Sequence, residues 1–106
     1  MVYLFLADGF EEIEALTPVD LLRRAGVEVV TVGVTGKTVT GSHGIAVSAD
    51  VSADEALAML KGGKSPEMIV LPGGMPGAAT LDASSVVDTF IDAAKKANAY
   101  IAAICA

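Results

Sequence analysis

Four apolar runs, separated by segments with helical features, constrain the fold of this chain more than any other part of its sequence. The runs are rich in aliphatic and β-branched residues and occupy 2–7 (VYLFLA), 27–34 (VEVVTVGV), 68–72 (MIVLP) and 99–105 (AYIAAIC). Continuous apolar runs of this length are typical of parallel strands that are covered on both faces. The sequence therefore predicts a doubly wound α/β sheet of mostly parallel strands, connected by right-handed crossovers.

Capping residues and apolar periodicity predict three helices between these strands. The Thr-Pro pair at 17–18 supplies a cap and a proline for the first helical position, and Gly26 ends that segment. Ser52 and Glu55 have the spacing of a capping box at the start of a short second helix. A third helix is predicted over about 84–98, where an apolar stripe faces a charged one.

Two further features concern the organisation of the domain. The segment 38–50 (TVTGSHGIAVSAD) alternates around glycines and predicts a β-hairpin inserted between the second strand and the second helix. The fourth apolar run has no helix after it, although a parallel strand needs cover on both faces. We therefore expect residues 1–106 to be the N-terminal portion of a single domain.

Composition and charge exclude several classes of function. A chain of 106 residues, 53% hydrophobic and 19% charged, is expected to form one soluble globular domain rather than a disordered segment. The apolar runs are far shorter than the ~20 residues that a membrane helix needs. A net charge of −6 argues against nucleic acid and anionic membranes as partners. A single cysteine rules out an internal disulfide and fits a reducing cytoplasm.

Three of the predicted strand ends carry unusual residues that would meet at one edge of the sheet. The first strand is followed by ADGFEEIEAL (7–16), the third by the glycine-rich segment 72–78, and the fourth ends at Cys105. Ligand sites in open parallel sheets form outside the carboxyl ends of the strands. The side chains and amides expected at this edge are those of Glu14, Gly73, Gly74 and Cys105.

Cys105, the only cysteine, is the candidate nucleophile. A free cysteine is most often a small buried hydrophobe. A cysteine at the end of a strand differs when a helix begins just after it, because the amide groups and dipole of that helix favour the thiolate. The thiolate is the form that attacks carbonyl carbon and reacts with peroxide. The helix itself is inferred from the predicted fold.

Glu14 is the candidate acid–base residue. We expect Glu11 and Glu12 to form a solvated, acidic first turn of a helix. Glu14 differs because Pro18 cannot donate a hydrogen bond to its carbonyl group. Either the helix is continuous from about residue 11 with a kink at Pro18, or it begins at Thr17 and Glu14 lies in the preceding loop. Both geometries can turn the Glu14 carboxyl toward the sheet edge, where it could hydrogen-bond sulfur or transfer protons.

The remaining candidates are two glycines and a histidine. Gly73 and Gly74 are equally consistent with ordinary turn chemistry and with bare amides that approach an oxyanion closely. The surrounding segment matches neither of the common glycine-rich phosphate-binding patterns. His43 is the only histidine, and we expect it in a surface turn of the hairpin. With one histidine and one cysteine, no metal-ligand spacing is present, and we expect no metal.

As a set, the segments LADGFEEIEALTPVDLLRRAGVEV, VSAD, VLPGGMPGA and IAAICA resemble the ThiJ/PfpI superfamily, in its parkinsonism-associated deglycase and YajL-like branch. The resemblance extends over the whole chain in order. It implies a flavodoxin-like α/β fold, generally dimeric and free of metal and organic cofactors. Members of the family continue past the cysteine into a helix and reach roughly double this length, so the chain resembles their N-terminal half.

The resemblance assigns roles to individual positions. Cys105 matches the nucleophilic, oxidation-sensitive cysteine at a strand–helix elbow. Glu14 matches the glutamate whose protonated carboxyl group hydrogen-bonds that sulfur. Gly74 and Ala106 match the backbone amides that line an anion pocket, with Gly73 in the same turn. The histidine that the family carries near the cysteine would lie after the last residue of this chain.

The implied function is a cysteine-dependent glyoxalase or deglycase acting on 2-oxoaldehydes, such as methylglyoxal and glyoxal, or on their early protein adducts. Oxidative-stress protection and a homodimer are implied with it. The segment 1–106 alone is expected to be inactive, with the C-terminal remainder supplied in the same protein or by a separate chain. Two alternatives stay open: a non-enzymatic redox sensor or chaperone that works through oxidation of Cys105, and an amidotransferase-like or peptidase-like cysteine hydrolase.

Overall fold

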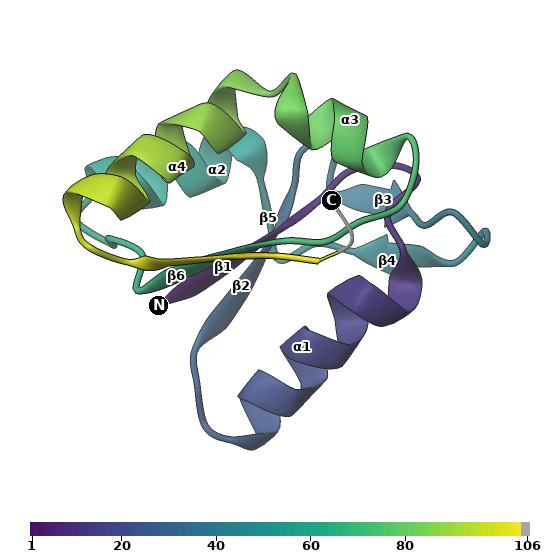
Figure 1. The fold of residues 1–106 in the computed structure, drawn as a ribbon, viewed down its shortest axis with the longest axis horizontal. Coiled ribbons are helices and arrows are strands. Elements are labelled where there is room, and N and C mark those ends of the chain that lie inside the picture. The colour runs from purple at the N-terminus through teal and green to yellow at the C-terminus, as the bar shows by residue number, and fades with distance from the viewer. Residues whose placement is uncertain (105–106) are drawn as a thin grey trace.

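The computed structural model describes residues 1–104, and its central feature is a five-stranded parallel sheet with helices on both faces (Figure 1). The sheet has the strand order β5-β2-β1-β6-β7. Its strands are β1 (Val2–Leu6), β2 (Val29–Gly33), β5 (Val51–Ser52), β6 (Met68–Leu71) and β7 (Tyr100–Ala103). The predicted doubly wound α/β sheet is confirmed. The sequence pattern missed only β5, which is two residues long and pairs with the end of β2.

Strand β1 lies at the centre of the sheet, and all five of its residues are buried. Its side chains alternate between two apolar clusters, as the two-residue repeat of a strand requires. Tyr3 and Phe5 pack on the face covered by α2 and α4, where the ring of Phe90 lies 4.7 and 5.1 Å from theirs. Val2, Leu4 and Leu6 pack on the opposite face, against α1.

Within residues 1–104, four helices flank the sheet, with α1 on one face and the other three on the opposite face (Figure 1). Their bounds are α1 (Glu12–Arg24), α2 (Ala53–Lys61), α3 (Gly77–Asp82) and α4 (Ser85–Lys96). The capping box of Ser52 and Glu55 is formed, with both of its hydrogen bonds present. The predicted third helix corresponds to α4, which begins after the N-cap residue Ser84. The short helix α3 was not predicted.

Helix α1 is continuous from Glu12 and contains Pro18, which confirms the alternative of a helix that runs from about residue 11. The alternative start at Thr17 is wrong. The N-cap residue is Glu11, whose side chain accepts a hydrogen bond from the Ile13 amide at 2.9 Å. A proline inside a helix costs about 3 kcal/mol. The helix includes the proline nevertheless, because the turns on both sides of Pro18 bury apolar side chains against the face of the sheet that α1 covers. These side chains include Ala15 and Val19.

The predicted hairpin is formed by β3 (Thr38–Thr40) and β4 (Ala46–Ser48), which pair antiparallel. It docks against the loop that connects β1 to α1. Within this contact the Gly9 amide donates to the Thr40 carbonyl at 2.8 Å, and the Ser42 amide donates to the Phe10 carbonyl at 2.8 Å. The hairpin therefore lies beside the N-terminus of α1, at the carboxyl edge of the sheet.

Strand β7 lies at one edge of the sheet and is the least covered of its longer strands. Tyr100 and Ile101 are 77% and 44% exposed, whereas β1 is buried throughout and the two central residues of β6 are buried.

In residues 1–104, every helix is too short or too polar to span a lipid bilayer.

Candidate functional site

The loops that follow β1 and β6 meet at the carboxyl edge of the sheet and are joined through Gly73. The Gly73 amide donates a hydrogen bond to Glu14 Oε1 at 3.0 Å. The Gly73 carbonyl accepts one from the Glu11 amide at 2.9 Å. Glu14, on the first turn of α1, is half-buried and directed at the loop after β6. Two of the predicted site residues, 59 positions apart in the sequence, are thus in direct contact.

Gly74 allows the two loops to approach each other closely. Its φ is +97°, in the left-handed region that favours glycine. A Cβ atom at this position would lie 2.5 Å from both the Glu11 nitrogen and the Gly9 oxygen. In the described part of the chain, the Gly74 amide has no hydrogen-bond acceptor. Of the two glycines in this turn, Gly73 is the one whose amide contacts Glu14.

The fourth predicted strand reaches the same edge. Strand β7 runs parallel to β6 with Leu71 opposite Ala103, and the Ile104 amide donates to the Leu71 carbonyl at 3.1 Å. The chain at residue 104 therefore lies beside the strand that leads into Gly73. The predicted nucleophile Cys105 and the predicted amide of Ala106 fall outside the described residues.

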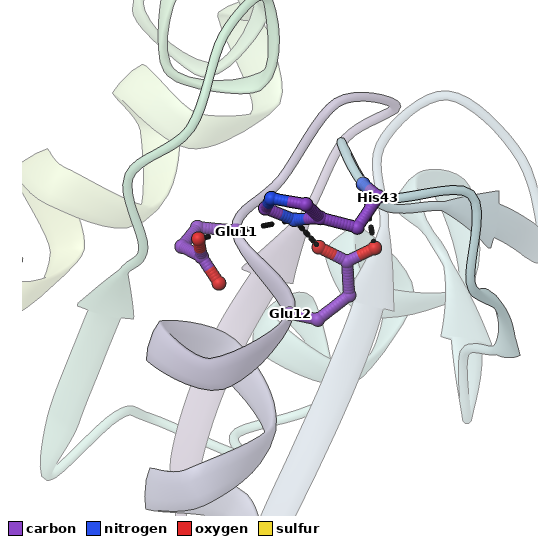
Figure 2. Close-up of side chains that lie close together, drawn as sticks. All are labelled: Glu11, Glu12 and His43. Atoms are coloured by element: carbon purple, nitrogen blue, oxygen red, sulfur yellow. Dashed lines mark hydrogen bonds and ion pairs between the residues drawn. The ribbon is translucent and has the colours of Figure 1, made fainter.

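A second polar cluster lies at the same edge, where α1 begins (Figure 2). Glu12 is 5% exposed, which corrects the expectation that it belongs to a solvated acidic turn. Its Oε2 accepts hydrogen bonds from the amides of His43 at 2.8 Å and Ile45 at 3.3 Å. Its Oε1 lies 2.8 Å from His43 Nδ1. The carboxylate is buried because it closes the β3–β4 turn, where a side chain at Gly41 would collide with it.

The contacts in this cluster shift the pKa values of both partners. Burial acts to raise the pKa of Glu12, but the hydrogen bonds from the His43 side chain and from the amides of His43 and Ile45 outweigh it and lower the pKa to about 2. The hydrogen bond to Glu12, together with the negative charges of Glu12 and Glu11, raises the pKa of His43 above 6.5. The two side chains thus stabilise each other's charged forms.

Sequence reasoning placed His43 correctly in an exposed turn but missed its contact with the first turn of α1. The two residues are 31 positions apart, and no local pattern joins them. One signal could have found the burial of Glu12. In a helix that begins at residue 12, Glu12, Ala15 and Val19 lie on the same face, and that face is the buried one.

Comparison with known proteins agrees with this architecture. The model of the DJ-1/PfpI family matches residues 1–106. The chain belongs to the DJ-1/PfpI family. It is 38% identical over 102 residues to the Parkinson disease protein 7 homolog of Danio rerio, covering 95% of this chain and 52% of that protein. It is 33% identical over 76 residues to a deglycase of Thermococcus kodakarensis, covering 66% of this chain and 46% of that protein.

A solved structure of a DJ-1/PfpI protein extends the similarity to three dimensions. The oxidized form of Toxoplasma gondii DJ-1 superimposes with a TM-score of 0.89 at 37% identity, covering 98% of this chain and 54% of that one. The flavodoxin-like fold expected from the resemblance is therefore confirmed. The chain spans about half the length of the relatives that it matches.

Proposed function

We propose that the whole protein is a cysteine-dependent, cofactor-free glyoxalase or deglycase that acts on methylglyoxal, glyoxal or their early protein adducts. Membership of the DJ-1/PfpI family and the similarity to a protein named as a deglycase support this assignment. The observation that carries it is the hydrogen bond between Glu14 and Gly73, which fixes a carboxyl group at the edge where β7 also ends.

The proposed reaction converts a 2-oxoaldehyde and water into a 2-hydroxy acid. The Cys105 thiolate attacks the aldehyde carbon, a C–S bond forms, and the carbonyl oxygen takes a proton to give a hemithioacetal. Glu14 removes the proton on that carbon and returns it to the neighbouring carbon, while the hydroxyl proton of the hemithioacetal passes to the ketone oxygen. The first carbon is thereby oxidised to a thioester and the ketone is reduced to an alcohol. Water then cleaves the thioester and regenerates the thiol, giving lactate from methylglyoxal.

The described residues support the two roles besides that of the thiol. Glu14 uses Oε1 to accept from Gly73, and within residues 1–104 its Oε2 makes no hydrogen bond. That oxygen is the one we assign to proton transfer. The Gly74 amide, together with that of Ala106, is assigned to the oxyanion that forms when the thiolate adds. The close packing of the loop after β1 keeps both groups in place without a side chain at Gly74.

The partners of the chain are part of the same proposal. We expect the region that follows residue 106 in the relatives to complete the site, within the same protein or as a separate chain. Residues 1–106 alone are then inactive. The active form is expected to be a homodimer in the cytoplasm, with no nucleic-acid or membrane partner.

The test is lactate formation from methylglyoxal by the full-length protein. Cys105→Ala is expected to abolish turnover, and Glu14→Gln is expected to reduce kcat by about 10²–10⁴-fold, the usual contribution of a general acid–base group. Ser85→Ala, an exposed substitution on α4, serves as the matched control. Unchanged turnover after Cys105→Ala would refute the proposal.

A redox sensor is the second candidate, and the oxidized state of the Toxoplasma gondii relative favours it. In this reading, peroxide oxidises the Cys105 thiolate to a sulfenate and then to a sulfinate, with water as the reduced product. Mass spectrometry after mild peroxide treatment tests the idea. A thiol that stays reduced up to denaturing peroxide concentrations would exclude it.

A further inference from the structure

The side chains of Glu11, Glu12 and His43 form a cluster that the thiol chemistry does not use (Figure 2). Glu11 and Glu12 stand at the start of α1, and His43 stands in the β3–β4 turn. One nitrogen or oxygen atom from each side chain lies within 4.8 Å of the other two. We propose that this cluster binds a divalent transition-metal ion such as Zn²⁺, through His43 Nδ1 and one oxygen of each carboxylate.

The ligand atoms are oriented by the backbone. Each carboxylate accepts from amides through one oxygen and presents the other to the imidazole. Glu11 Oε1 accepts from the Ile13 amide at 2.9 Å, and Glu11 Oε2 lies 3.9 Å from His43 Nδ1. Glu12 Oε2 accepts from the amides of His43 and Ile45, and Glu12 Oε1 lies 2.8 Å from Nδ1. Fixing one oxygen of a ligating carboxylate in this way is typical of the outer shell of metal sites.

The distances within the cluster suit a small metal ion. Zinc binds imidazole nitrogen and carboxylate oxygen at about 2.0–2.2 Å with tetrahedral geometry, which places neighbouring ligand atoms about 3.4 Å apart. The two distances measured from His43 Nδ1, 2.8 Å to Glu12 and 3.9 Å to Glu11, lie on either side of this value. Small movements of the two carboxylates in opposite directions relative to His43 Nδ1 bring both distances to this value.

The charge of the cluster favours a divalent cation. Two carboxylates face one imidazole, and within residues 1–104 neither Glu11 nor Glu12 forms an ion pair with a lysine or arginine. A divalent ion in place of the proton on Nδ1 offsets this excess of negative charge. The presence of an imidazole ligand selects zinc and similar transition metals over Mg²⁺ and Ca²⁺, which prefer oxygen ligands alone.

The cluster is open to solvent on one side. It lines a hollow of about 270 Å³, whose other lining residues are Ile13 and Ile45. The His43 side chain is 67% exposed, so a metal ion can enter without opening the fold. The hollow also leaves space for a water molecule as a fourth ligand.

The ring signals of His43 provide a direct test, and they are identified in the NMR spectrum by their absence from the His43→Gln variant. Zn²⁺ is titrated into the Cys105→Ser variant of the full-length protein, which removes the only thiol of residues 1–106. We expect a saturable 1:1 shift of the His43 ring signals with Zn²⁺ and none with Mg²⁺ at the same concentration. Adding Glu11→Gln should weaken Zn²⁺ binding by at least about 10-fold. Adding Asp92→Asn, which changes an exposed acid on α4, should leave the affinity within about twofold.

Glu11 is chosen for substitution because it is more exposed than Glu12, and glutamine keeps an oxygen for the Ile13 amide. Ring signals that do not respond to Zn²⁺ would overturn the proposal. Equal Zn²⁺ affinity with and without Glu11→Gln would also overturn it, because an exposed imidazole alone would then account for binding. A ring shift of the same size with Mg²⁺ would overturn it as well, because it would show a general ionic effect.

Discussion

Replacing Gly74 by alanine tests whether the close contact between the loops after β1 and β6 contributes to the stability of the fold. The chain offers a matched control. Gly63, which follows the end of α2, has almost the same φ, +96° against +97° for Gly74. A Cβ atom at Gly63 meets nothing within 4 Å, whereas one at Gly74 would lie 2.5 Å from two backbone atoms. Both variants pay the cost of a left-handed alanine, and only Gly74→Ala adds a collision.

The expected magnitudes follow from these two terms. A left-handed alanine costs roughly 1–2 kcal/mol, partly offset by about 0.4–1 kcal/mol because alanine restricts the unfolded chain. Gly63→Ala should therefore lower the free energy of unfolding by about 1 kcal/mol. Overpacking against fixed backbone adds about 1–3 kcal/mol, so Gly74→Ala should lose about 2–4 kcal/mol.

Urea unfolding followed by circular dichroism measures the difference between the two variants. Gly74→Ala should also melt roughly 5–20 °C below Gly63→Ala, given about 4–8 °C per kcal/mol for a domain of this size. Equal stability of the two variants, within about 0.5 kcal/mol, would refute the reasoning. It would show that the loops after β1 and β6 separate at no cost and that their contact does not hold Glu14.

Three further predictions concern the helix cap, the core and the buried acid. Ser52→Ala removes half of a capping box and should cost about 1 kcal/mol in urea unfolding, whereas the exposed Ser85→Ala should cost less than about 0.5 kcal/mol; equal losses would contradict the cap. Phe90→Ala should cost about 3–5 kcal/mol, because the Phe90 ring contacts two aromatic rings of β1, and a loss below about 1 kcal/mol would show that the core refills the cavity. His43→Gln should lower the free energy of unfolding most between pH 4.5 and 6.5. Below that window the stabilisation from Glu12 is lost, because its pKa falls from 4.5 to about 2 on folding. Above the window the stabilisation from His43 is lost, because its pKa rises from 6.5 on folding. A loss of stability that is the same from pH 3 to pH 9 would refute that coupling.

The sequence alone determined the layers of the fold. Continuous apolar runs identify the four longer strands of the sheet, because a parallel strand buried on both faces has no polar alternation. The capping box of α2 and the hairpin are equally local signals, since each depends on residues only a few positions apart. The start of α1 was harder, because Pro18 is a strong local breaker and only the burial of Ala15 and Val19 overrides it.

The tertiary structure decided how the site residues meet. The prediction that Glu14 and Gly73 share one edge follows from the rule for parallel sheets, but the hydrogen bond between them depends on how closely the loops approach. The contact of Glu12 with His43 crosses 31 positions and joins a helix to a separate hairpin, so no periodicity encodes it. Local patterns determine which segments become strands and helices, and the packing of one element on another determines which carboxylates are buried and what they bind.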